Sequence, residues 1–341
     1  MIPEFNWSGR GVVEASRTLK PGWAVRSHWV TGWIRAVLTH LEARAGLAIL
    51  VFFGLLAVSH PVLLGTVWEP GIYDPRAGYD ITISHPSHPT FAHLLGTDAF
   101  GKDTFSMLLA GTRPALVTGV LAGVTTAVVA LTVASFSSAF RPADRILGIL
   151  VDAALYLPVP VVMLILGADP QADRLTPEVF GLLFGLLTGL SSGALVLRSQ
   201  AMPIMASGFV DAARIAGATN RQVITRHLIP ALVPMAGAYV VLGAAGAIVT
   251  QGFLSWLSYT ATYNDWGTLV YWAIVTRDFT GQLLWHVLIA SGAALTLLTL
   301  GFHLLSIGFK KAAARPWTSL PPTYVEPVPP EALAKEIALT S

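Results

Sequence analysis

The sequence predicts an all-α, polytopic membrane protein with six transmembrane helices. Hydrophobic residues make up 54% of the 341 residues and charged residues only 12%, about half the ~25% that soluble domains carry. The mean hydropathy is +0.64, and several long runs contain no Asp, Glu, Lys or Arg. About 20 apolar residues span a bilayer as a helix, because each residue rises about 1.5 Å. These runs are therefore long enough to cross a membrane.

The six helices follow from these runs in chain order. The third is expected within 146–168, where Asp152 is the only charged residue. The fifth and sixth runs are longer than one helix needs, so their surplus is expected in interfacial or re-entrant segments. Small residues in the second and fifth helices, GVLAGVTTA and MAGAYVVLGAAGA, are typical of close helix packing in lipid. The other five helices are expected in charge-free runs, 45–68, 114–140, 179–197, 228–264 and 279–309.

The third helix carries prolines and an acid. Pro158 and Pro160 each remove a backbone donor and should kink the helix, which is tolerated where neighbouring helices cover the freed carbonyl groups. Asp152 would be costly at mid-bilayer, but it follows Arg145 by only seven residues. We therefore place it within about two turns of the cytoplasmic face and interpret it as a polar packing or gating residue.

The distribution of Lys and Arg predicts the orientation. With residues 1–44 in the cytoplasm, the inner segments hold 16 of the 21 basic residues. Basic residues concentrate on the cytoplasmic side of membrane proteins, so both termini are expected there. The outer segments then hold only Arg76, Lys102, Arg113, Arg174 and Arg277.

Three segments surround or interrupt the six-helix domain, which we place at 45–311. The lead-in, 1–44, lacks the pattern of a cleavable signal peptide. Its second half has apolar residues at helical spacing, which indicates either an interfacial helix or a cytoplasmic extension of the first spanning helix. An external loop, 69–112, is rich in Pro, Gly and His and is expected to end in a short helix. The tail, 312–341, is proline-rich, which is typical of extended or disordered segments.

Several chemistries are excluded or disfavoured. The chain has no cysteine, so it has no disulfide, thiolate metal site or cysteine nucleophile, and it has no basic patch with interleaved aromatics for nucleic acid. Residues 96–103, GTDAFGKD, contain the G-x-x-x-x-G-K of a phosphate-binding loop, but Asp103 replaces the Ser or Thr that would hold magnesium. His85, His88 and His93 could bind Ni or Zn, but their spacing matches no standard site, and we interpret them as loop histidines.

The segment 198–230, between the fourth and fifth helices, is much longer than the ~2–8 residues that a simple helix connection needs. It contains Asp211-Ala212-Ala213, three residues, Gly217, nine residues, and then His-Leu-Ile-Pro ending at Pro230. A short helix from Asp211 would have an acid in its first turn, where the helix dipole favours it. Gly217 would end that helix in the left-handed conformation.

Basic side chains in this segment, Arg214, Arg221 and Arg226, could pair with acids on a partner or with lipid phosphates. The length and the positive charge of the segment therefore indicate that a soluble partner protein binds it. The alternative is a solvated basic loop that only obeys the positive-inside rule.

This spacing resembles the EAA loop of binding-protein-dependent ABC importer permeases, Glu-Ala-Ala, three residues, Gly, nine residues, Ile-x-Leu-Pro. Asp211 stands for the Glu, His227 for the Ile and Ile229 for the Leu. Four further stretches resemble the C-type subunit of the dipeptide/oligopeptide/nickel permeases, and the likeness covers roughly 40–312. They are Tyr73-Asp74-Pro75, LLGTDAFGKDTFSMLLAGTRPALVTG, DRILGILVDAALYLPVPVVML and TQGFLSWLSYTATYNDWGTLV.

The resemblance implies a type I ABC importer permease (MetI-like) fold in the cytoplasmic membrane of a bacterium or archaeon. It also implies a non-catalytic pore subunit that works with a second homologous permease, two ATP-binding subunits and an extracytoplasmic substrate-binding protein. The chain itself would hold no cofactor, since ATP and Mg would bind to the ATPase subunits.

Two groups of site residues are implied. Those that would couple to the ATPase are Asp211, Ala212, Ala213, Arg214, Gly217, Ala218, Arg221, His227 and Pro230. Pro230 would fix the angle at which the fifth helix leaves the loop. Those that would form the outer gate or receptor dock are Phe253, Trp256, Tyr259, Trp266 and Gly267.

Departures from the family pattern leave the substrate open. Lys102 and Met107 replace arginines, Gln251 stands where Glu is usual, and Ser258–Tyr259 interrupt the usual Gly-Leu-Gly. Peptides are expected, with nickel chelates or oligosaccharides as alternatives. An ion-gradient-driven secondary transporter would show paired, interrupted helices and several buried acids, and a membrane anchor would leave the loop spacing unexplained.

Overall fold

The computed structural model describes residues 34–167, 175–257 and 265–313. Regular structure in these ranges is helical, with no strand and only two isolated bridges, Thr97↔Asp103 and Arg277↔Leu283. Expectations for most of the lead-in, for the tail beyond residue 313, and for Arg174 and Tyr259 lie outside the described residues.

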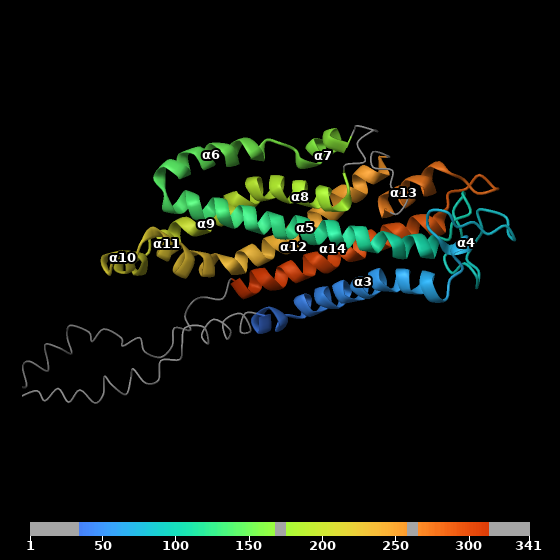
Figure 1. Cartoon of the computed structure of the whole chain (residues 1–341), viewed down its shortest axis with the longest axis horizontal. Coiled ribbons are helices and arrows are strands. Elements are labelled where there is room, and N and C mark those ends of the chain that lie inside the picture. The colour runs from blue at the N-terminus through green and yellow to red at the C-terminus, as the bar shows by residue number, and fades with distance from the viewer. Residues whose placement is uncertain (1–33, 168–174, 258–264, 314–341) are drawn as a thin grey trace, which may run out of the picture.

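The helices are numbered as in Figure 1, and η1 and η2 are π-helical turns. In chain order they are α3 (Leu41–Thr66), α4 (Pro70–Tyr73), α5 (Thr104–Ala139), α6 (Arg141–Leu155), α7 (Val159–Gly167), α8 (Pro177–Thr188), η1 (Gly189–Gly193), α9 (Ala194–Met205), α10 (Gly208–Ile215), α11 (Asn220–Val223), η2 (Ile224–Leu228), α12 (Ile229–Trp256), α13 (Trp266–Val275) and α14 (Trp285–Ala313).

Five helices in the described part are long and apolar enough to cross a membrane: α3, α5, the continuous Pro177–Met205, the continuous Asn220–Trp256, and α14. The pair α6 and α7 makes a sixth candidate that is bent by 75°. Pro158 and Pro160 flank the start of α7, so the missing donors account for the break. The predicted kink and the predicted number of spans are both confirmed.

The spanning helices lie side by side along the long axis of the molecule (Figure 1). One end, which we call the inner end, carries α10, α11, the start of α3 and the end of α14. The opposite outer end carries α4, the loop that follows it, and α13. The start of α3 and the end of α14 thus lie at the same end of the bundle as α10 and α11 (Figure 1), and the cytoplasmic location of both termini stays a prediction.

The centre of the bundle is the crossing of α5 and α12, the predicted second and fifth helices. A Cβ at Gly123 would lie 2.0 Å from the carbonyl oxygen of Val240, and one at Gly243 would lie 2.6 Å from Oγ1 of Thr126. Only glycine allows the two backbones to approach this closely. The expected close packing is therefore confirmed.

A second glycine contact was not foreseen. Gly181, Gly185 and Gly189 recur every four residues on α8 and η1, and all three face α5. A Cβ at these positions would lie 2.7, 2.5 and 2.8 Å from carbonyl oxygens of α5. This small-residue stripe brings a third spanning helix against the α5–α12 crossing.

The structure differs from the expected boundaries in two places. Helix α5 begins at Thr104, so residues 104–112 of the expected external loop are the outer end of a spanning helix. Asp103 caps that end by accepting a hydrogen bond from the backbone N–H of Ser106. Asp152 is exposed on α6, so it does not form the expected polar packing within the chain.

Candidate functional site

The first candidate site is the segment between α9 and α12 at the inner end. Helix α10 covers Gly208–Ile215, beginning three residues before the predicted start at Asp211. Its side chain Val210 is fully buried with Val223 and Leu228 from the following turns, in a cluster that includes Leu197 and other residues of α9. The helix is therefore fastened to the spanning helices on both sides of the loop.

Gly217 ends α10 in the predicted left-handed conformation, with φ +89°. The N–H of Gly217 donates to the carbonyl of Arg214 at 2.9 Å, and the N–H of Ala218 donates to that of Ala213 at 2.9 Å. This pair of bonds is a Schellman motif, which satisfies the last carbonyl groups of a helix. A capping box on Thr219 then starts α11.

Most of the predicted coupling residues lie on the accessible surface of this segment. Asp211, Ala212, Arg214, Gly217 and Arg221 are exposed, whereas Ala213, Ala218, His227 and Pro230 are half-buried. Pro230 is the second residue of α12 and comes shortly after the π-helical turn η2, and the helix continues through it, since Asn220–Trp256 forms one continuous helical span. That Pro230 fixes the angle at which the fifth helix leaves the loop stays a prediction.

Sequence reasoning missed the apolar residues that this segment exposes. Ile215, at the end of α10, is 88% exposed, and Phe209 is 53% exposed. Phe209 and Ile215 are therefore apolar side chains on the accessible surface of an otherwise polar and basic segment.

At the outer end, His93 links three distant points of the chain. Its Nδ1 lies 2.8 Å from Oδ2 of Asp103 and its Nε2 lies 3.2 Å from Oδ2 of Asp80. All three side chains are buried. Hydrogen bonds from the Thr82 side chain and backbone, assisted by His93, lower the pKa of Asp80 to about 2, whereas burial raises the pKa of Asp103. The His93 imidazole thus connects Asp80 of the outer loop with Asp103, the N-cap residue of α5.

The apparent phosphate-binding loop has a different role. The Asp98 carboxylate accepts the backbone N–H groups of Phe100 and Lys102, while Gly96 and Gly101 adopt φ +70° and +79°. The carboxylate thus occupies the N–H groups that would bind a phosphate. A second loop repeats this arrangement around Asp278, which accepts from the backbone N–H groups of Thr280 and Gln282.

The outer histidines do not converge. His85 contacts the Thr97 hydroxyl and the Asp80 carbonyl oxygen, His88 lies beside His286, and His93 is held by its two aspartates. Within the described ranges no group of three or more His, Cys, Asp or Glu side chains is arranged so that it could hold a metal ion.

The predicted gate residues divide into buried and exposed ones. Trp266 is 2% exposed and donates from Nε1 to the carbonyl of Leu108 at 2.8 Å, which fastens α13 to α5. Gly267 is also buried, since a Cβ there would lie 2.1 Å from the Gly252 carbonyl oxygen. Phe253 and Trp256 are exposed and lie against each other. Among the predicted gate residues that the structure describes, only Phe253 and Trp256 are accessible to another protein.

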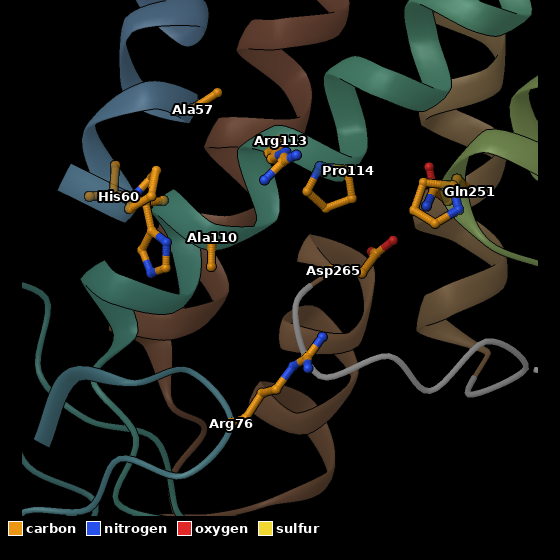
Figure 2. A pocket seen from close by; sticks show the side chains of 11 residues that line it. Ala57, His60, Arg76, Ala110, Arg113, Pro114, Gln251 and Asp265 are labelled. Carbon is orange, nitrogen blue, oxygen red and sulfur yellow. The ribbon is translucent and has the colours of Figure 1, made fainter. Parts of the chain in front are cut away.

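The second candidate site is a cavity of about 360 Å³ in the outer half of the bundle. Figure 2 shows side chains that reach it from the outer loop (Arg76), from α3 (His60), from α5 (Arg113) and from α12 (Gln251). Asp265, the N-cap of α13, lies on its wall. Sequence reasoning named Gln251 only as a departure from a pattern and did not single out the other four.

Comparison with known proteins gives consistent results. Residues 119–315, more than half of the chain, match the model of the family described as "Binding-protein-dependent transport system inner membrane component". A putative peptide transport system permease protein of Brucella abortus is 26% identical over 81% of this chain and 88% of its own length. The glutathione transport system permease protein GsiD of Pectobacterium atrosepticum is 25% identical over 85% and 91%. The oligopeptide transport system permease protein OppC of Mycobacterium bovis is 29% identical over 70% and 79%.

Proposed function

Because the chain belongs to the family of binding-protein-dependent transport system inner membrane components, we propose that it is a transmembrane permease subunit of an ATP-driven peptide importer. The observation that carries this proposal is α10, a short helix with exposed Ile215 that buried side chains fasten to the spanning helices. The similar proteins named for peptide, oligopeptide and glutathione transport support the substrate class.

In this proposal the chain performs no catalytic step itself. ATPase subunits, which bind ATP and Mg, dock on α10 at the cytoplasmic face, and their closure displaces α10 together with α9 and α12. A second, homologous permease completes the pore. An external binding protein delivers the peptide to the outer end, where Phe253 and Trp256 are exposed. The ATP-driven motion opens the cavity outward, and hydrolysis reverses it.

The decisive experiment replaces Ile215 by asparagine in the complete complex. Burying an isoleucine contributes about 1.5–3 kcal/mol, so its loss should weaken ATPase docking about tenfold or more. The matched control is Ile81→Asn, because Ile81 is 87% exposed, as Ile215 is, but lies at the outer end. Co-purification of the ATPase subunits and ATP-driven peptide uptake into proteoliposomes are measured for both variants.

We expect Ile215→Asn to lose co-purification and uptake while Ile81→Asn keeps its ATPase subunits. If both variants keep their ATPase subunits and transport normally, α10 is not the docking element. Uptake that persists without ATP but stops when an ion gradient is collapsed would instead support a secondary transporter.

A further inference from the structure

The outer cavity contains two arginines that no acid neutralises directly. Within the described residues, neither Arg76 nor Arg113 forms an ion pair. Two acids act on these arginines only through the longer-range attraction of their charges. Asp74 accepts the backbone N–H groups of Arg76 and Ala77, and Glu178 is held mainly by a hydrogen bond with Thr176. The two guanidinium groups therefore remain available to an anion, and guanidinium groups bind carboxylates by paired hydrogen bonds.

The loop that carries Arg76 is held in place. The Lys102 ammonium donates to the carbonyl oxygens of Pro75 at 2.9 Å and Arg76 at 2.6 Å. Arg113 projects from α5 directly before Pro114, which also lines the cavity. The two arginines thus approach the cavity from fixed backbone positions, which lowers the entropic cost of binding a ligand between them.

The opposite wall supplies acceptors. Gln251 is 9% exposed, lines the cavity, and its Oε1 has no hydrogen-bond partner in the described part of the chain. A buried acceptor without a partner is unfavourable, and an N–H donor on a bound molecule would satisfy it. The Asp265 carboxylate is fixed by the N–H of Gly267 at 2.7 Å and by Ser255. Burial raises its pKa to about 6, so it is mostly ionised at neutral pH.

Cations on one side and acceptors on the other match a molecule with a free carboxylate and N–H donors. We propose that this cavity binds the carboxyl end of a zwitterionic peptide, with Arg113 and Arg76 on the carboxylate and with Gln251 and Asp265 on peptide N–H or ammonium groups. The cavity volume of about 360 Å³ lies at the lower end of the ~300–1,000 Å³ typical of small-molecule sites, which suits a short peptide. This inference rests on the proposed function.

The test uses the complete complex in proteoliposomes, with its binding protein, and two forms of one tripeptide: the free acid and its C-terminal amide. Since the binding protein is the same in every sample, a change in the ratio of the two uptake rates reports on the permease. We expect Arg113→Gln to lower uptake of the free acid about tenfold relative to the amide, and Arg113→Lys to restore part of the difference. Arg76→Gln, which removes the second guanidinium group from the cavity, should also reduce uptake of the free acid selectively.

The matched control is Arg277→Gln, because Arg277 is an exposed arginine at the same end that does not line the cavity. Its ratio should equal that of the wild type. The site is refuted if Arg113→Gln and Arg76→Gln leave the ratio unchanged, or if both peptides lose uptake equally while ATPase activity persists. If the wild type shows no ATP-driven uptake of either form, the proposed function itself fails.

Discussion

Replacing Gly123 by alanine places a Cβ 2.0 Å from the carbonyl oxygen of Val240, at the crossing of α5 and α12. Ordinary van der Waals contact begins at 3.4 Å, so the two backbones must separate by about 1.4 Å. Neither atom belongs to a flexible side chain, and the clash cannot be relieved by a rotamer change.

The expected cost follows from two opposing terms. Alanine favours a helix over glycine by about 1 kcal/mol, whereas inserting a methyl group into a closely packed contact costs about 1–3 kcal/mol. Because this contact is backbone to backbone, we expect the upper part of that range and a net destabilisation of about 1–2 kcal/mol. The separation would also disturb Gly243, which lies on the same contact.

The assay is thermal unfolding of the purified chain in detergent, followed by size-exclusion chromatography after heating. The matched control is Gly292→Ala in α14, where a Cβ meets nothing within 4 Å. This variant should be as stable as the wild type or slightly more stable, by its helix propensity alone. The reasoning is refuted if Gly123→Ala unfolds at the wild-type temperature, or if Gly292→Ala is destabilised equally.

Three further predictions concern the two ends of the molecule. Gly217→Ala meets no neighbour but forces a non-glycine residue to φ +89°, which costs about 1–2 kcal/mol, so backbone hydrogen exchange in α10 should accelerate. The control Gly208→Ala, also in open space, should leave exchange unchanged. Equal exchange rates in the two variants would contradict the role of Gly217 in capping α10. The pKa of Asp265 is raised to about 6 by burial, so the stability it contributes is fully present below its unfolded value near 4 and is lost as pH rises to about 6. Asp265→Asn, which keeps the capping acceptor, should then flatten the dependence of melting temperature on pH between 4 and 7, and an unaltered pH profile would refute this. For Asp80 and His93, a double-mutant cycle with Asn and Gln at pH 7 should give a coupling free energy of about 0.5–3 kcal/mol, because the two buried side chains are in direct contact at 3.2 Å; zero coupling would show that this contact contributes nothing. Asp80, whose pKa is lowered to about 2 mainly by Thr82, contributes stability above pH 4 that is lost as pH falls toward 2.

Features that depend on neighbouring residues could be predicted from the sequence. The charge-free runs gave the spans, Pro158 gave the break between α6 and α7, and Gly217 gave the left-handed end of α10, since each effect acts within one or two turns. The stripe of Gly181, Gly185 and Gly189 was equally visible as a four-residue repeat. It could have been found by applying the small-residue rule to the fourth helix as well.

Features that join distant residues could not be predicted in this way. His93 contacts residues 10 and 13 positions away in an irregular loop, where no periodicity links them. The cavity gathers Arg76, Arg113 and Gln251 from three separate segments, and their meeting depends on how the helices pack. Trp266 was predicted to belong to the outer gate. Its burial also depends on helix packing, because its Nε1 donates a hydrogen bond to the Leu108 carbonyl oxygen of α5.

The continuity of the span Asn220–Trp256 connects the two ends of the molecule. Its first residue, Asn220, lies within the segment 198–230, and Gln251 lies 31 residues further on, about 45 Å away at ~1.5 Å per residue. Thermodynamic linkage then requires reciprocity: if a partner on α10 changes the affinity of the cavity for its ligand, the ligand changes the affinity of α10 for that partner by the same factor. Under that condition, a peptide bound at Gln251 would act as an allosteric effector of the ATPases. Occupancy of the outer cavity would then change the affinity of α10 for its partner at the other end of the same helical span.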